Sequence, residues 1–180
     1  NRPEDIYATN MHKPCLAQHA AFITQMQNGD AEWIREKFFH LQMFVNNYLN
    51  HHRHRMSGLF FWQDDVAIGV DNDPTTFFRP PGSSGSIYLN SLMYKELKAT
   101  AYLARQLNLV EIAKAYEKDA EDLKQAIRDN CWDKWLGFYY SVDFNLLPYQ
   151  DEEHWTKHSG FPRTYNNLIM RIGVWSGFLA

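Results

Sequence analysis

A group of aspartates lies in an aromatic-rich segment near the middle of the chain. The segment begins Gly58-Leu59-Phe60-Phe61-Trp62, and its aspartates are Asp64, Asp65, Asp71 and Asp73. A carboxyl group held among aromatic side chains loses solvation, which raises its pKa and lets it act as a general acid near neutral pH. Cleavage of a glycosidic bond needs such an acid, because the sugar oxygen is a poor leaving group unless it is protonated. The segment therefore has the residue types that a glycosidase uses.

The same aspartates also have a structural interpretation. Aspartates favour turns and helix caps, because a short carboxylate accepts hydrogen bonds from nearby backbone N–H groups. We interpret Asp64, Asp65 and Asp73 in this way. A calcium loop is a weaker alternative, since its spacing with a distal glutamate is absent from the sequence.

Two other groups of residues have types that bind metals or anions. His51, His52 and His54 end a predicted helix, but no carboxylate or cysteine nearby completes a metal site, and a helix C-terminus itself favours positive charge. Gly82-Ser83-Ser84-Gly85 precedes another predicted helix, where backbone N–H groups bind anions, yet it follows no strand and contains no lysine. We therefore expect no metal site and no cofactor.

Length and composition limit the class of protein. The chain has 180 residues, 45% of them hydrophobic and 22% charged, with a net charge of −3. These values exclude a disordered chain and argue against a nucleic-acid binder, which needs a basic surface. No apolar run approaches the roughly 18 residues of a membrane span. Aromatic residues make up 16% of the chain, which suits either an ordinary core or platforms for sugar rings.

Helical periodicity organises most of the sequence. Apolar residues recur at steps of three or four, and Gly29 and Ser86 have the types that end and begin helices. The second helix is expected to bury Trp33, Phe38, Leu41, Val45, Tyr48 and Leu49. The expected helices cover residues 14–28, 30 to the run 51–55, 86–107 and 109–130, and a further one begins over 166–180.

The remaining segments lack a helical period. Residues 56–85 are a long loop, 131–144 are a short hairpin turning at Leu136-Gly137, and 145–163 are a loop. Helix pairs joined tightly at one end and by long loops at the other are typical of helical toroids and solenoids. The sequence therefore predicts an all-α fold whose loops carry the function.

Several motifs, taken in order, resemble glycoside hydrolase family 63, with the bacterial mannosylglycerate-hydrolase-like branch nearest. The resemblance spans nearly the whole chain, although Ile68 replaces the serine usual in the family before Gly69. The motifs are Asn28-Gly29-Asp30 with Trp33-Ile34, Gly58-Leu59-x-x-Trp62, Gly69-Val70-Asp71-Asn72-Asp73-Pro74, Leu89-Asn90-x-x-Met93-x-x-Glu96, Cys131-Trp132-Asp133 through Gly137-Phe138-Tyr139-Tyr140, and Trp175-Ser176-Gly177-Phe178-Leu179.

The resemblance implies a fold, a reaction and a set of site residues. It implies an (α/α)6 toroid and exo-acting hydrolysis, with inversion, of an α-linked glucoside or mannoside in an oligosaccharide or glycosyl-glycerate. Asp71 corresponds to the general acid. Trp62 and Asn72 would line the sugar subsite, and Arg79 is a further candidate for binding substrate. Residues 1–180 would form the central part of one catalytic domain.

The general base of the family is a glutamate that we expect beyond Ala180, so the chain alone would be catalytically incomplete. Two alternatives remain at this stage. One is a non-catalytic helical-repeat module that binds carbohydrate or protein, and the other is another (α/α)6 enzyme, such as one that is trehalase-like or a polysaccharide lyase. The expected partners are a carbohydrate substrate and the remainder of the same polypeptide, with no nucleic acid and no membrane.

Overall fold

The computed structural model describes residues 11–66, 68–70, 73–77, 79–144, 168–172 and 175–180. The α-helices among them are α1 (Leu16–Met26), α2 (Phe38–His51), α3 (Ile87–Gln106) and α4 (Val110–Cys131). Short 3-10 helices are η1 (Glu32–Lys37) and η2 (Trp175–Leu179). The strands have two residues each: β1 (Ser84–Gly85), β2 (Trp132–Asp133), β3 (Phe138–Tyr139), β4 (Val142–Asp143) and β5 (Leu168–Ile169).

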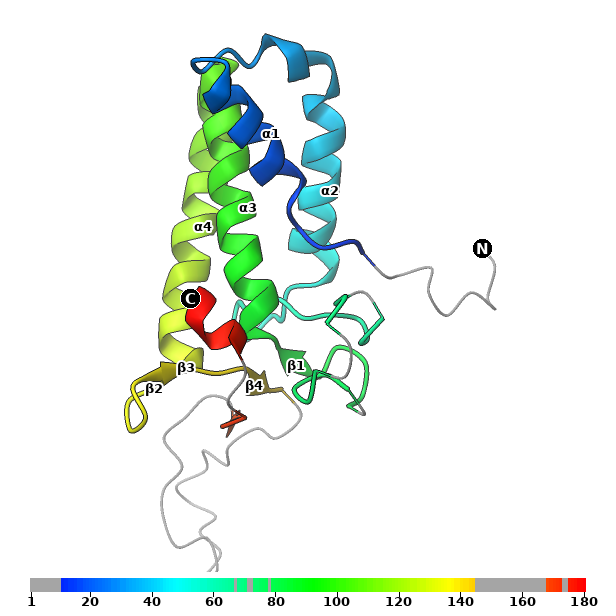
Figure 1. Ribbon diagram of the computed structural model, residues 1–180, viewed down its shortest axis with the longest axis vertical. Helices are drawn as coiled ribbons and strands as arrows, with labels where there is room; N and C mark the ends of the chain where they lie inside the picture. Colours follow the sequence, from blue (N-terminus) through cyan, green and yellow to red (C-terminus); the bar gives the residue numbers. More distant parts are fainter. Residues whose placement is uncertain (1–10, 67, 71–72, 78, 145–167, 173–174) are drawn as a thin grey trace, which may run out of the picture.

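Helix α3 is the central element of the helical bundle. It packs along α4 and also contacts α1, α2 and η2, while the short strands and the long loop gather at the end where α3 begins (Figure 1). The mostly helical composition agrees with the all-α expectation, apart from these small sheets. None of the described helices has the length and apolar character needed to cross a bilayer.

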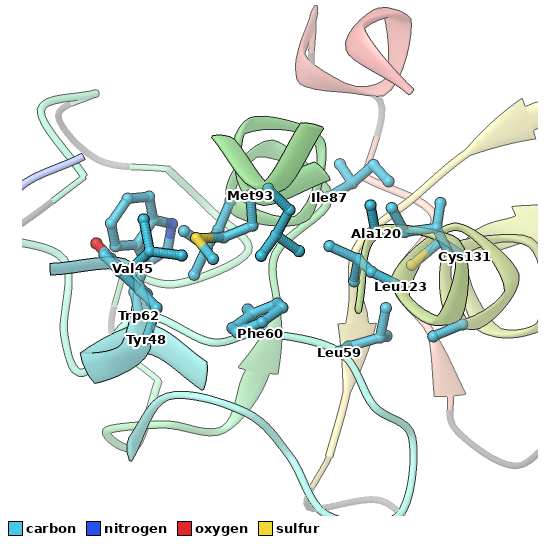
Figure 2. Close-up of a cluster of buried hydrophobic side chains, with 14 of the residues drawn as sticks. Val45, Tyr48, Leu59, Phe60, Trp62, Ile87, Met93, Ala120, Leu123 and Cys131 are labelled. Carbon is cyan, nitrogen blue, oxygen red and sulfur yellow. The ribbon is translucent and has the colours of Figure 1, made fainter. Parts of the chain in front are cut away.

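The start and the buried face of α3 follow directly from the sequence. Ser86 is its N-cap, and the Ser86 hydroxyl accepts a hydrogen bond from the Leu89 N–H at 3.4 Å. Leu89, Met93 and Leu97 recur at helical spacing and are fully buried. They join a core cluster to which α2, α4 and the long loop also contribute (Figure 2). The predicted cap and apolar stripe are therefore confirmed.

In the connection from α1 to α2, the expected end of the first helix at Gly29 is confirmed, and the expected start of the second helix is corrected. Asn28 and Gly29 have positive φ angles of 56° and 88°, as helix-ending residues do. The Asp30 carboxylate accepts from the Glu32 N–H at 2.9 Å, but a 3-10 turn follows, so the α-helix begins only at Phe38. Trp33 was expected to be buried and is instead 45% exposed, although its indole N–H donates to the hydroxyl of the buried Thr24.

The expected helix over residues 166–180 is wrong within its described part. Leu168–Ile169 is extended and pairs antiparallel with Val142–Asp143, and Trp175–Leu179 forms only a 3-10 turn. A short apolar run fits either structure by periodicity, so the neighbouring strand decides. The predicted hairpin is confirmed, with Trp132 opposite Tyr139 and the turn at Gly137. The loop predicted over 145–163 lies outside the described residues.

A buried carboxylate fastens α1 to α3. Glu96, on α3, has no exposed surface, and its oxygens accept from the Ala17 N–H at 2.7 Å and the Gln18 N–H at 3.3 Å. The Gln18 side-chain amide adds a third donor at 3.1 Å. Helix N-termini leave such N–H groups without intrahelical acceptors, so Glu96 caps α1 from a neighbouring helix. Burial raises the pKa of Glu96, and the hydrogen bonds from Ala17 and Gln18 partly offset that shift.

Replacing Glu96 by alanine is expected to lower the free energy of unfolding by about 2–4 kcal/mol, because buried N–H groups lose their acceptor. Urea unfolding at neutral pH measures this loss. Alanine at the exposed Glu36 is the matched control and should change the value by less than about 0.5 kcal/mol. Equal effects of the two substitutions would contradict the capping role.

The raised pKa of Glu96 also predicts a pH dependence of stability. The folded protein holds this proton more tightly than the unfolded chain, so the free energy of unfolding should fall as the pH rises from the ordinary value of 4.5 through the folded-state pKa. Above that pKa the contribution is constant. Urea unfolding of the parent and of Glu96→Gln between pH 4 and 8 measures the difference, which should show this decline. A constant difference would disprove it.

Candidate active site

The aromatic segment of the predicted loop is held to α3 by one side chain. The Asn90 amide oxygen accepts from the Phe60 N–H at 2.7 Å, and the Asn90 amide nitrogen donates to the Phe60 carbonyl at 2.9 Å. Asn90 itself is fully buried. Because both hydrogen-bonding groups of Phe60 are satisfied by one rigid helix, the backbone entering the candidate site has a fixed position.

Apolar side chains of the same loop are buried in the main core cluster and hold the loop on the helices. Leu59, Phe60 and Ile68 have no exposed surface and belong to the main core cluster (Figure 2 shows the first two). Ile68, the residue in which this chain differs from the family pattern, is therefore a core residue that fixes the position just before Gly69. The long loop is confirmed, and it is closely packed on the helices.

Trp62 lies deeper than its predicted place in a sugar subsite suggests. Its side chain is 3% exposed and shares the cluster with Val45 and Met93 (Figure 2). Its buried indole N–H has no hydrogen-bond partner within the described part of the chain. The Trp62 ring lies 6.3 Å from Tyr88, whose ring lies 5.3 Å from the half-exposed Trp175. These rings form an aromatic row from core to surface, and contact between Trp62 and a sugar stays a prediction.

Asp71 and Asn72, the expected acid and its neighbour, lie outside the described residues. The residues beyond them are firmly held: Asp73 is 7% exposed, and its carboxylate accepts from the N–H and the hydroxyl of Thr75 at 2.9 and 2.8 Å. The Asp64 carboxylate likewise accepts from the Val66 N–H at 2.9 Å. The turn-forming interpretation of Asp64 and Asp73 is confirmed. We use the term acid loop for residues 68–73.

A lysine that sequence reasoning missed lies against the acid loop. Gly69 has a φ of +63°, and a Cβ there would come within 2.5 Å of the Lys13 Nζ and 2.8 Å of its Cε. The positive φ angle therefore favours glycine at this position, and the end of the Lys13 side chain lies against it. Nothing in the sequence pairs the two residues, because Lys13 precedes α1 and only the tertiary fold brings it to this loop.

Arg79 joins the far end of the loop to the small sheet. Its Nε donates to the Ser84 hydroxyl at 3.0 Å, and its Nη2 forms an ion pair with Asp143 on β4. The Ser84 hydroxyl in turn donates to the Thr75 carbonyl at 2.5 Å. Arg79 thus has a structural role in connecting the loop to β4, and its predicted contact with substrate stays a prediction.

The histidines after α2 are packing residues. His52 is 5% exposed between the rings of Tyr48 and Phe61, and burial lowers its pKa. His54 stacks on Phe144 at 4.1 Å, and burial lowers its pKa as well. Both rings are therefore neutral at physiological pH. Within the described ranges, no three histidine, cysteine, aspartate or glutamate side chains come together as a metal site.

Comparison with solved structures bears on the fold. One solved structure, described as a sialidase, superposes with a TM-score of 0.56 and 21% identity. The match covers 64% of this chain and 10% of that one, so the chain spans about a tenth of that structure's length, and the likeness concerns the fold alone. A search of curated proteins finds no match.

The family follows from a family model. Residues 1–155 match the mannosylglycerate hydrolase MGH1-like glycoside hydrolase domain. The chain belongs to this family of glycoside hydrolase domains, which confirms the resemblance drawn from the motifs.

Asn90 is expected to stabilise the fold through its two hydrogen bonds to the backbone of Phe60. Replacing Asn90 by alanine leaves the Phe60 N–H and carbonyl without partners in the core and should lower the free energy of unfolding by about 2–4 kcal/mol. Urea unfolding monitored by tryptophan fluorescence measures the loss. Alanine at the exposed Asn50 of α2 is the control and should leave stability within about 0.5 kcal/mol. A loss no larger than in this control would contradict the role of Asn90 in holding the Phe60 backbone.

Proposed function

We propose that this domain belongs to an exo-acting glycosidase that hydrolyses an α-linked glucoside or mannoside with inversion, using Asp71 as its general acid. Membership of the family of glycoside hydrolase domains carries the proposal. The substrate is either an oligosaccharide or a glycosyl-glycerate, and the name of the matched family favours the second. Hydrolysis by paired carboxylates needs no cofactor.

The build of the acid loop supports Asp71 in this role. Ile68 on one side is fully buried, and Asp73 on the other is locked by two hydrogen bonds to Thr75. A general acid works only when its proton is held at a fixed position relative to the bond that breaks. The buried side chain of Ile68 and the bonded carboxylate of Asp73 are the described features that support this role for the residue between them.

The second carboxylate is proposed to come from elsewhere in the polypeptide. An inverting enzyme keeps its acid and base about 6.5–9.5 Å apart so that a water molecule fits between the base and the sugar. In this proposal residues 1–180 are the central part of an (α/α)6 toroid, and a glutamate outside them supplies the base. The helix pair α3 and α4, with the long loop at one end, is the kind of unit from which such a toroid is built.

Replacing Asp71 by asparagine in the full-length protein is expected to lower kcat by about 10²–10⁴-fold, because the leaving oxygen loses its proton donor. Release of sugar from α-glucosides and α-mannosides measures the loss, and NMR of the first product should show the β-anomer. Asp64→Asn is the matched control, since asparagine preserves the turn at Asp64 and should keep activity within a few fold. Near-normal turnover of the Asp71 variant, or an α-anomeric first product, would refute the corresponding part of the proposal.

Trp62 offers a test of the aromatic row. Trp62→Ala should lower the free energy of unfolding by about 3–5 kcal/mol, because a large side chain leaves the core. Trp62→Phe keeps most of the packing and removes the indole N–H. If that group binds the sugar, the phenylalanine variant should raise KM several-fold while thermal unfolding changes little. An unchanged KM in a stable Trp62→Phe variant would place Trp62 in the core alone.

A further inference from the structure

Helix α1 is apolar on two opposite faces. On one face, Ala17, Ala20 and Ala21 are buried in a core cluster with Leu103 and Ala104 of α3. The other face carries large apolar side chains that are 42–72% exposed and recur at helical spacing: Leu16, Phe22, Ile23 and Met26. We call these four residues the outer stripe of α1. A helix that is apolar all round is typical of a protein interior and not of a surface that faces water.

The distribution of charge separates α1 and α2 from α4. Neither the 11 residues of α1 nor the 14 residues of α2 include a lysine, arginine, aspartate or glutamate. Ten of the 22 residues of α4 are of these types, and exposed ones pair within the helix, as Lys114 does with Glu111 and Lys118 with Asp122. Helix α4 therefore has the surface of a helix in contact with water, whereas α1 and α2 lack one.

The four helices form two adjacent pairs with the same arrangement. Helices α1 and α3 are parallel neighbours, because Ala17 at the start of α1 bonds to Glu96 in the middle of α3, while Gly29 after α1 lies against the side chain of Gln106 at the end of α3. Helices α2 and α4 run in the opposite direction (Figure 1). In stacked repeats each pair packs on its neighbours, and a terminal pair needs a polar outer face. The outer stripe of α1 is not such a face.

The size of the outer stripe of α1 bears on what covers it. At roughly 200 Å² for a fully exposed large side chain, its four residues offer on the order of 400–500 Å² of apolar surface. A stable dimer takes about 800 Å² from each partner, so the stripe is small for binding a second copy. A helix of the same polypeptide meets the stripe at a high effective concentration and loses no translational freedom of a separate molecule. The area therefore favours a helix of the same polypeptide.

We propose that the outer stripe of α1 is the interface for a further helix of the same polypeptide, which lies parallel to α1 and packs on it as α1 packs on α3. This inference rests on the part of the proposed function that places residues 1–180 inside a larger helical domain, and it identifies the surface at which another part of that domain joins. The facing side of the partner helix is apolar and uncharged, because the stripe has no charged residue with which to pair.

Photo-cross-linking in the full-length protein identifies the partner of the stripe directly. Phe22→p-benzoylphenylalanine places a photoreactive aromatic side chain at an exposed position of the stripe. Irradiation should give a cross-link within one polypeptide, and mass spectrometry of its peptides should place the other end in a helical segment outside residues 1–180. The same substitution at Lys118, which is exposed on α4, is the matched control and should give no cross-link.

Thiol labelling tests the same surface through a smaller change. In the full-length protein, Met26→Cys should react with a thiol reagent at least about 100-fold more slowly than Lys118→Cys, because a covered site reacts only after local opening. The parent protein, with Cys15 and Cys131, gives the background rate.

Equal labelling rates of the two variants would overturn the inference. A cross-link that ends within residues 1–180, or one that joins two polypeptides and increases with protein concentration, would overturn it as well. Neither measurement depends on catalysis. An active glycosidase with a rapidly labelled Met26→Cys variant would therefore overturn this inference alone, and an inactive protein with the expected cross-link would overturn the proposed function alone.

Discussion

The buried carboxylate of Glu96 is the interaction on which the arrangement around the loop depends. It lies in the middle of α3, and it satisfies the N–H groups at the start of α1, which has no side-chain cap from its own N-cap residue Cys15 among the described residues. A charge is expensive to bury, so its position tolerates little variation. By fixing the start of α1 against α3, Glu96 also fixes the segment before it, and with that segment Lys13.

The described residues in and before the acid loop are held by three kinds of contact rather than by regular secondary structure. Asn90 pairs with the backbone of Phe60, Ile68 fills the core, and Asp73 closes a turn with Thr75. Each of these satisfies a buried polar group or removes apolar surface from water. These contacts hold Ile68 and Asp73, which are described residues on either side of the proposed acid Asp71.

The charges near the loop follow a consistent division. Arg79 is paired with Asp143, Glu96 is occupied by α1, and burial keeps His52 and His54 neutral. Lys13 is different, because its ammonium rests on Gly69 without an acceptor in the described part of the chain.

Local patterns in the sequence were sufficient for α1, α3 and α4 and for most of α2. They also predicted the cap at Ser86, the stop at Gly29, the turns at Asp64 and Asp73, and the family through its ordered motifs. These features depend on periodicity and on side chains that bond to backbone a few residues away. The strand at Leu168–Ile169, the burial of Trp62 and the approach of Lys13 to Gly69 required the tertiary structure. Each depends on a partner far away in the sequence, and no local pattern encodes which distant segment will supply the hydrogen bonds, the core or the charge.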